Sequence, residues 1–215
     1  MITAVIAVRA GSQRVRNKNI RPFVDSNLLE LKLSLLKQVR NIDEIIVDSD
    51  SNEMLEIGFE HGVSVQKRID YYASSECTNS EFHGHIAETT NTDTIFLTPV
   101  CAPFVSIESH ENAIEYYLQN DFDSVVSVSE VKNHLWLDGK PLNYDLNDVP
   151  NSQDLPDVLK LNYGITIVDR DVMKNEKRVV GHNPGFYKLN EIESIDIDTE
   201  LDFFIAEQIY RRNFQ

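Results

Sequence analysis

The sequence predicts an α/β fold: a Rossmann-like, mostly parallel sheet with helices on both faces and a protruding arm. Up to about residue 130, short apolar segments rich in β-formers alternate with segments of helical periodicity. This alternation is typical of βαβ units, and the apolar runs suit strands that are buried on both faces. The chain has 215 residues, of which 41% are hydrophobic, and this suffices for one compact domain.

The expected elements can be placed along the chain from these patterns. The strands are 2–8, 44–47, 63–66, 94–97, 124–128 and 163–168, and the helices are 27–40, 52–61, 80–90 and 107–119. Gly62 directly follows the second helix, as glycines at helix ends often do. A last strand-like stretch at 194–197 precedes a helix from about Thr199. We expect the whole chain, 1–215, to form a single domain.

The regular alternation stops near Glu130, and the segment from about 132 to 160 is interpreted as a hairpin or arm that leaves the body. This segment is rich in Asn, Asp, Pro and Leu, with turn signals at Asp138-Gly139. It also carries an apolar cluster around Trp136. Because such a cluster on an arm has to be buried somewhere, a second subunit is a natural partner. The sequence therefore favours a homodimer.

Overall composition limits the possible partners and the compartment. With 20 basic and 35 acidic residues the formal charge is −15, which argues against nucleic acid or an anionic membrane as the main partner. Cys77 and Cys101 form no disulfide framework, which fits a reducing compartment. The apolar run 1–8 is too short for a signal peptide core or a membrane span. We expect a cytoplasmic protein, and we interpret His83 and His85 as surface residues rather than zinc ligands.

The N-terminal loop concentrates positive charge. No acidic residue precedes Asp25, but five cations do: Arg9, Arg14, Arg16, Lys18 and Arg21. Ligands bind at the carboxyl ends of the strands in such sheets, and a loop with a glycine lets backbone N–H groups approach phosphate oxygens. The loop matches neither the P-loop nor the dinucleotide fingerprint. An anion-binding site is favoured over a merely solvated basic loop.

Acidic residues gather at the other end of the chain. Asp196 and Asp198 are two residues apart, so in an extended stretch both carboxylates point to one side. Paired carboxylates suit Mg²⁺, which takes one or two of them together with phosphate oxygens. Alternatively, Asp198 caps the following helix. If the two terminal segments meet in space, they form a site for a polyanion and a metal.

Both terminal segments resemble those of acylneuraminate cytidylyltransferases, the CMP-sialic acid synthetases. The first match is Arg9-Ala-Gly-Ser12 followed by Lys18-Asn19, and the second is Ser-Ile-Asp-Ile-Asp-Thr-Glu-Leu-Asp at 194–202. Weaker matches in the same order lie at Arg68 with Tyr72-Ala-Ser74, at Leu97-Thr-Pro, at Gln153-Asp-Leu-Pro156 and at Lys160-Leu-Asn-Tyr-Gly164. The sequence departs from the family pattern at Gln13, Thr98 and Ser152.

The resemblance implies an enzyme that transfers CMP from CTP to an acidic 2-keto sugar, sialic acid or a related nonulosonic acid, and releases pyrophosphate. It implies that Arg9, Lys18, Asp196 and Asp198 are catalytic, with the two aspartates as ligands of Mg²⁺. Substrate-binding roles follow for Ser12, Asn19, Arg68, Gln153, Lys160 and Asn162. Family members of this kind are dimers whose arm reaches the neighbouring active site.

Two other hypotheses remain open. Asp48-Ser-Asp50 follows an expected strand and has the DxD spacing of glycosyltransferases that use a metal and a sugar nucleotide. A degenerate paralogue that binds nucleotide without turnover is the second, because of the departures at Gln13, Thr98 and Ser152.

Overall fold

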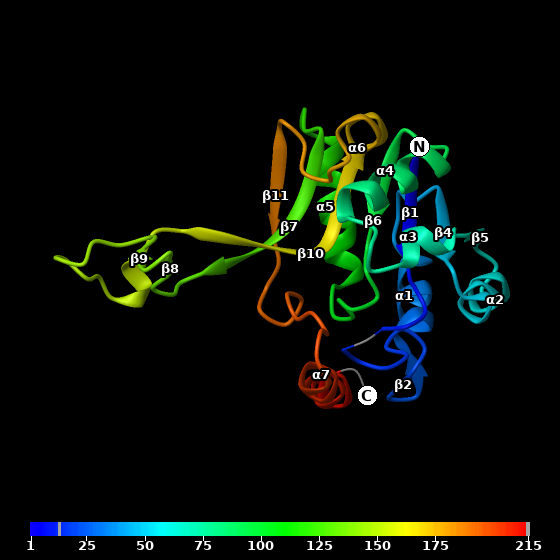
Figure 1. Ribbon diagram of the computed structural model, residues 1–215, viewed down its shortest axis with the longest axis horizontal. Helices are drawn as coiled ribbons and strands as arrows, with labels where there is room; N and C mark the ends of the chain where they lie inside the picture. Colours follow the sequence, from blue (N-terminus) through cyan, green and yellow to red (C-terminus); the bar gives the residue numbers. More distant parts are fainter. Residues whose placement is uncertain (13, 214–215) are drawn as a thin grey trace.

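A computed structural model describes residues 1–12 and 14–213, and a seven-stranded sheet of order β11-β7-β10-β6-β1-β4-β5 forms its centre (Figure 1). Four of the six strand pairings are parallel, whereas β10 runs antiparallel to both of its neighbours. The predicted fold class is therefore confirmed. The strands are β1 (Ile2–Ala7), β4 (Glu44–Ser49), β5 (Ser64–Lys67), β6 (Thr94–Leu97), β7 (Ser124–Val131), β10 (Val158–Asp169) and β11 (Pro184–Lys188).

Helices cover both faces of the sheet. Ala4 and Ile6 of β1 belong to a large buried cluster, whereas Val5 belongs to a smaller one. Because successive side chains of a strand point to opposite faces, the two clusters lie on opposite sides of the sheet. The large cluster includes residues of α1 (Leu28–Leu36), α2 (Asn52–Glu60), α5 (Ile107–Leu118) and α7 (Glu200–Asn213), and the small one includes residues of α4 (Asn79–Thr89) and α6 (Arg170–Glu176). A further short helix is α3 (Asp70–Ala73). Of the helices described, none has the length and apolar character that crossing a bilayer requires.

Local sequence signals set most helix ends. The side chains of Ser51, Thr78 and Ser106 accept hydrogen bonds from the first turns of α2, α4 and α5. The expected helix at 27–40 is shorter, because α1 ends at Leu36. The backbone N–H groups of residues 38 and 39 donate three residues back, so the α-helical pattern stops there.

The C-terminal third differs most from the prediction. Residues 194–197 form no strand, so that expectation is wrong; they follow a turn and run irregularly up to α7. The strand expected at 163–168 is the end of the longer β10, which begins at Val158 within the segment expected to be arm. Neither α6 nor β11 was predicted. The sequence of β11, Pro-Gly-Phe-Tyr-Lys, begins with two residues that strands disfavour, so its local signal is weak.

The expected excursion is present as an arm. Figure 1 shows β7 and β10 running out of the body, with the short strands β8 (Trp136–Leu137) and β9 (Lys140–Pro141) near its far end. A 3-10 helix, η1 (Ser152–Asp154), lies on the return path. Elsewhere, β2 (Pro22–Phe23) and β3 (Ser26–Asn27) form a small hairpin. The arm exposes more than half of the surface of five apolar side chains, Trp136, Leu137, Leu142, Leu146 and Val149.

Candidate active site

The cationic loop follows β1 at the edge of the sheet where the parallel strands β1, β4 and β6 end. Two hydrogen bonds hold it to the end of β4. The backbone N–H of Val8 donates to the Asp48 carbonyl at 3.0 Å, and that of Ala10 donates to Asp50 Oδ1 at 2.9 Å. The loop is therefore fixed at the carboxyl ends of the strands, where ligands bind in sheets of this kind.

The first and last segments of the chain meet at this loop. Arg14 Nη2 lies 2.8 Å from Asp198 Oδ1, and Lys18 Nζ lies 3.9 Å from the same oxygen. Lys18 also donates to the carbonyl of Ile197, whose own N–H donates to the Cys101 carbonyl at 2.9 Å. Cations that follow β1 and carboxylates that precede α7 therefore border one pocket, next to the loop that follows β6.

This pocket, which we call the loop pocket, has a volume of about 220 Å³. Five residues predicted to be functional line it: Arg9, Ser12, Lys18, Asn19 and Asp198. Asn19 is nearly buried and its Nδ2 donates to the Arg9 carbonyl at 3.1 Å, so it also holds the loop in shape. With three cations, Arg9, Arg14 and Lys18, on its wall, the pocket suits an anion. Gln13, where the sequence departs from the family pattern, lies outside the described residues.

Asp196 and Asp198 flank the buried side chain of Ile197 and are themselves accessible. Asp198 lines the loop pocket, and the Asp196 carboxylate lies near Cys101, which lines it too. Within the described part of the chain, no group of three or more His, Cys, Asp and Glu is arranged to hold a metal. Two carboxylates beside an anion pocket nevertheless fit Mg²⁺, which completes its coordination with phosphate oxygens and water.

The alternative role for Asp198, as the cap of the last helix, is wrong. The Thr199 hydroxyl accepts a hydrogen bond from the Asp202 N–H at 3.2 Å, and the Asp202 carboxylate accepts from the Thr199 N–H at 2.7 Å. This reciprocal pair is a capping box. The Asp198 carboxylate is therefore not needed for the cap and faces Arg14 instead.

A second hollow, of about 450 Å³, adjoins the loop pocket at Arg9 and is lined by Arg68, Tyr72, Ser74 and Ser75, among others. Arg68 is 3% exposed, and its guanidinium is paired with Asp48 and lies over the Phe82 ring. Its position borders this hollow, but its charge is already balanced. We call this space the Arg68 hollow.

The DxD hypothesis is not favoured by the geometry. Asp48 has no exposed surface, and its carboxylate accepts from Arg68 and from Gln66. Asp50 accepts from the backbone of the cationic loop. Both carboxylates therefore hold the protein together, and a buried, paired Asp48 does not suit an exchangeable metal.

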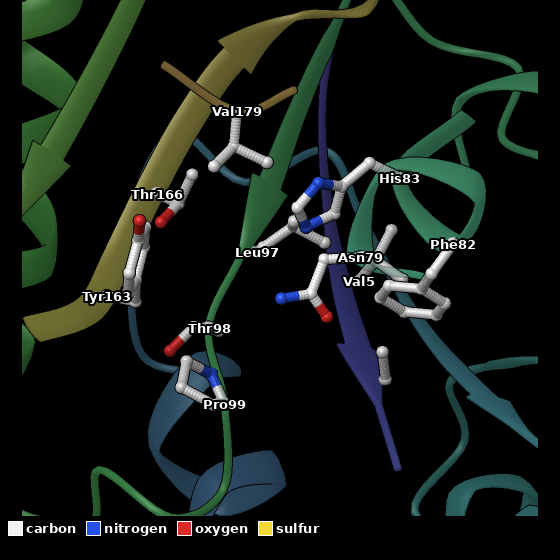
Figure 2. A pocket seen from close by; sticks show the side chains of 11 residues that line it. Val5, Asn79, Phe82, His83, Leu97, Thr98, Pro99, Tyr163, Thr166 and Val179 are labelled. Carbon is white, nitrogen blue, oxygen red and sulfur yellow. The ribbon is translucent and has the colours of Figure 1, made fainter. Parts of the chain in front are cut away.

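A third space, of about 290 Å³, lies between β1, the end of β6, β10 and α4, and we call it the α4 cavity (Figure 2). It shares Ala7 and Pro99 with the loop pocket, and Asn79 and Phe82 with the Arg68 hollow. The three spaces thus adjoin one another. His83 lines the cavity and His85 is 8% exposed and stacked on Tyr72, so the surface expectation is wrong for His85.

Three predicted substrate-binding residues lie elsewhere in the described structure. Gln153 is exposed in η1 on the arm, and Lys160 is exposed on β10, where it pairs with Ser129 of β7. The Asn162 amide accepts from Gly164 N–H at 3.3 Å and donates to Ser194 Oγ at 3.3 Å, so it links β10 to the segment that carries Asp196. The linings given above for the three spaces include none of the three.

Sequence reasoning missed Lys32, which is buried behind the loop that follows β6. Its Nζ donates to the Ala102 carbonyl at 2.9 Å and to Thr98 Oγ1 at 3.3 Å. Thr98, where the sequence departs from the family pattern, also contacts His110 Nε2 at 3.3 Å. Burial, with Lys32 nearby, lowers the pKa of His110 to about 3, so this histidine is neutral. The spacing of Lys32 from Leu28, Leu29 and Leu36 places it on the apolar face of α1, and this signal could have revealed it.

The thiol of Cys101 has no nucleophilic character here. Burial, together with the neighbouring Asp196 carboxylate, raises the pKa of Cys101 to about 12. The thiolate is the nucleophilic form, and it is scarcely populated at neutral pH. Cys101 therefore lines the loop pocket without acting as a nucleophile.

A mostly parallel sheet with a cationic, glycine-containing loop at the carboxyl ends of its strands defines a class of α/β proteins that bind phosphorylated ligands. The sequence matches the family described as Cytidylyltransferase over residues 3–155. The chain belongs to this family and is a nucleotidyltransferase, so the predicted membership and the predicted enzyme class are confirmed.

Several characterised proteins are similar to the chain. It is 25% identical to the Post-translational flagellin modification protein B of Campylobacter coli, over 100% of this chain and 97% of that protein. It is 28% identical to the CMP-N,N'-diacetyllegionaminic acid synthase of Legionella pneumophila, over 99% and 97%. It is 25% identical to the N-acylneuraminate cytidylyltransferase of Streptococcus agalactiae, over 93% of this chain but only 51% of that protein. The chain thus spans about half the length of the relatives of this last kind.

Solved structures support the fold. The structure of a CMP:2-keto-3-deoxy-manno-octonic acid synthetase complexed with CTP superposes with a TM-score of 0.75, covering 99% of each chain at 13% identity. At this identity the similarity shows the architecture alone.

Proposed function

We propose that the protein transfers CMP from CTP to an acidic 2-keto sugar, sialic acid or a related nonulosonic acid, and releases pyrophosphate. The observation that carries this proposal is the meeting of Arg14 and Lys18 with Asp198 at the loop pocket. This juxtaposition provides cations for a triphosphate and carboxylates for its metal. The sugar class is suggested by the relatives named N-acylneuraminate cytidylyltransferase and CMP-N,N'-diacetyllegionaminic acid synthase.

In this proposal, the acceptor's anomeric hydroxyl attacks the α-phosphorus of CTP. A new P–O bond forms to the sugar, the bond to the β-phosphate breaks, pyrophosphate leaves, and the hydroxyl proton passes to water. Such chemistry needs mainly positioning and charge neutralisation. Arg9, Ser12 and Lys18 bind the triphosphate in the loop pocket, and Arg14 leaves Asp198 to join them. Asn19 keeps the loop in shape.

Asp196 and Asp198 are the proposed ligands of Mg²⁺. When bound, the ion neutralises charge on the transferring phosphoryl group. The two carboxylates alone would repel a triphosphate, so their place beside the cationic loop suits a nucleotide that carries its metal ion. The Arg68 hollow, with Tyr72 and Ser74 on its wall, is the proposed place for the cytidine.

The α4 cavity is the proposed place for the acceptor, because it adjoins the loop pocket at Ala7 and Pro99. Its volume of about 290 Å³ lies near the lower end of small-molecule sites. Gln153 and Lys160 are on or beside the arm, so we propose that they serve a neighbouring subunit's site in a homodimer. Lys160 would then meet the sugar carboxylate.

Two measurements test the proposal. CTP with Mg²⁺ should raise the melting temperature more than ATP, GTP or UTP at equal concentration, because only a bound ligand shifts the folding equilibrium. Pyrophosphate release should then require both CTP and an acidic 2-keto sugar. Equal shifts in melting temperature from all four nucleotides would show that the protein has no preference for cytidine.

The remaining hypotheses give different outcomes in the same assays. A degenerate paralogue would show the CTP shift without pyrophosphate release across a panel of acidic sugars. A glycosyltransferase would release no pyrophosphate and would need a preformed sugar nucleotide.

A further inference from the structure

The wall of the α4 cavity on β10 contains a strained residue. Tyr163 has a φ of 55°, which lies in the left-handed region of backbone conformation. Apart from Gly, Asn and Asp, residues rarely adopt this conformation. It lies where the pairing of β10 with β7 shifts register between Leu161 and Thr166. Bulges and strained residues of this kind concentrate beside binding sites.

Neighbouring side chains hold this conformation in place. Asn162 Oδ1 accepts from the Gly164 N–H at 3.3 Å and from the Ser127 hydroxyl, and Ser127 Oγ accepts from the Ile165 N–H at 2.9 Å. These contacts come from β7 and from the bulge itself. The backbone is thus fixed on both sides of Tyr163, and its side chain remains 45% exposed and lines the cavity.

The cavity that Tyr163 borders is uncharged and largely apolar. Figure 2 shows Tyr163 and Thr166 on the β10 side and Asn79 and His83 of α4 on the opposite side. Val5, Leu97 and Val179 supply apolar surface, and Val5 and Val179 are only 1% and 6% exposed. Burial lowers the pKa of His83, so its ring is neutral near pH 7. None of the described lining residues carries a full charge at that pH.

We infer that the α4 cavity binds the uncharged tail of the acceptor and prefers methyl and acylamino groups to hydroxyls, with Tyr163 as the specificity-determining residue. The inference rests on the proposed function. A tail hydroxyl against Val5 or Val179 would lose its hydrogen bonds to water, which is unfavourable, whereas a methyl gains from leaving water. The polar groups on the wall belong to Asn79, His83, Thr98, Tyr163 and Thr166, and those of Asn79, His83 and Tyr163 can pair with an amide.

Two nine-carbon acids test the preference. N-acetylneuraminic acid has a tail with three hydroxyls, whereas N,N'-diacetyllegionaminic acid has a second acetamido group and a terminal methyl. With saturating CTP and Mg²⁺, kcat/KM from pyrophosphate release should be at least about tenfold higher for the second acid, since a single methylene in an apolar pocket is worth about 10- to 200-fold. Val179→Thr, which exchanges a methyl for a hydroxyl, should lower the ratio of the two kcat/KM values. Equal values, or the opposite order, would overturn the inference.

Substitutions at Tyr163 separate its contact with the acceptor from its backbone strain. Gly and Asn both tolerate the left-handed region, so Tyr163→Gly and Tyr163→Asn should fold with an undiminished melting temperature. Both should lose about tenfold or more in kcat/KM for the diacetylated acid, mainly through KM, while keeping the CTP-induced thermal shift. Asn41→Gly is the control, because Asn41 has a φ of 65° in an exposed turn. Wild-type kinetics in both Tyr163 variants would rule out its role.

A binding measurement tests the inference even if the protein converts neither acid. That result would count against the proposed function for these acceptors. Calorimetric titration of each acid into the protein with CTP and Mg²⁺ then decides the selectivity. Tighter binding of the diacetylated acid that is lost in Tyr163→Gly supports it, and equal or absent binding of both acids contradicts it.

Discussion

Asp198 lies where the two ends of the chain meet, and it faces cations while the cap of the following helix is made by Thr199 and Asp202. Charge at this residue can therefore be changed without disturbing the helix start. The same holds for Asp196, which is exposed beside Cys101. These two carboxylates are where a catalytic role is most easily separated from a structural one.

Asp196→Asn and Asp198→Asn should each lose activity and keep stability. The pair of Asp198 with Arg14 is solvent-exposed, with 42% and 69% of the side chains accessible, and such pairs contribute at most about 1 kcal/mol. Loss of a metal ligand should lower pyrophosphate release by about 100-fold or more. Kinetics at several Mg²⁺ concentrations and thermal melts measure both. Near-normal turnover at ordinary Mg²⁺ would exclude that residue from the metal site.

Lys32 should make stability depend on alkaline pH. Burial lowers the pKa of Lys32 from 10.5 to about 8. Between these values the unfolded chain binds a proton on this lysine that the folded chain has lost, so the free energy of unfolding rises with pH across that window. Relative to Lys32→Met, the wild type should gain about 3 kcal/mol between pH 8 and pH 10.5. Urea unfolding of both proteins at several pH values measures this difference, and a constant difference would show that Lys32 does not titrate as described.

At the scale of elements, the start of α7 sets the position of the carboxylate segment. Phe203 and Ala206 of this helix are buried in the large core, and the Thr199–Asp202 capping box closes its first turn. The carboxylate segment is therefore tied to the body by Ile197 on one side and by the helix on the other.

Thr199→Ala should lower stability and keep activity, which is the opposite of the effects expected for Asp196→Asn and Asp198→Asn. Loss of the capping hydroxyl should cost about 1 kcal/mol of stability, which corresponds to a fall of about 2–4 °C in Tm for a chain of this size. Pyrophosphate release at 25 °C should change by less than about threefold, because Thr199 is not in the lining of the loop pocket. A loss of activity as large as in Asp198→Asn would show that the cap itself is needed for catalysis.

At the scale of the whole molecule, the arm exposes the apolar surface on which the proposed dimer rests. Five apolar side chains on it are more than half exposed, and Gln153 and Lys160 lie on it or beside it, outside the linings of the loop pocket, the Arg68 hollow and the α4 cavity. Exposed apolar surface of this extent marks an interaction site. We propose that a second copy of the chain covers it.

Light scattering should therefore give a mass near twice 24.6 kDa for the wild type. Trp136→Glu should shift this mass towards the monomer and lower activity, because a charge is costly to bury in an interface. Phe59→Glu is the matched control, since Phe59 is an apolar aromatic residue of the body that is 74% exposed. A wild-type mass of 24.6 kDa at assay concentration would refute the dimer.

Local patterns predicted most of the first two thirds of the fold because strands such as 94–97 and helices such as α5 carry their own periodicity and caps. Local patterns failed where the conformation of a segment depends on its pairing with distant segments of the chain. β11 and the irregular run at 194–197 take their conformation from β7 and from the loop after β6, which the local sequence does not reveal. The surroundings of Asn162 and Lys160 could not be predicted either, because they are set by pairing with residues far away in the sequence.

The sequence by itself determined the family, the α/β class and the two charged segments, because residue type and short-range spacing are local properties. Only the tertiary structure decided that Arg14 and Asp198 meet and that Asp48 is buried against Arg68. It also placed Lys32 behind the site and Tyr163 beside the α4 cavity. Each of these depends on contacts between residues far apart in the chain or on backbone geometry at a bulge, which spacing alone does not fix.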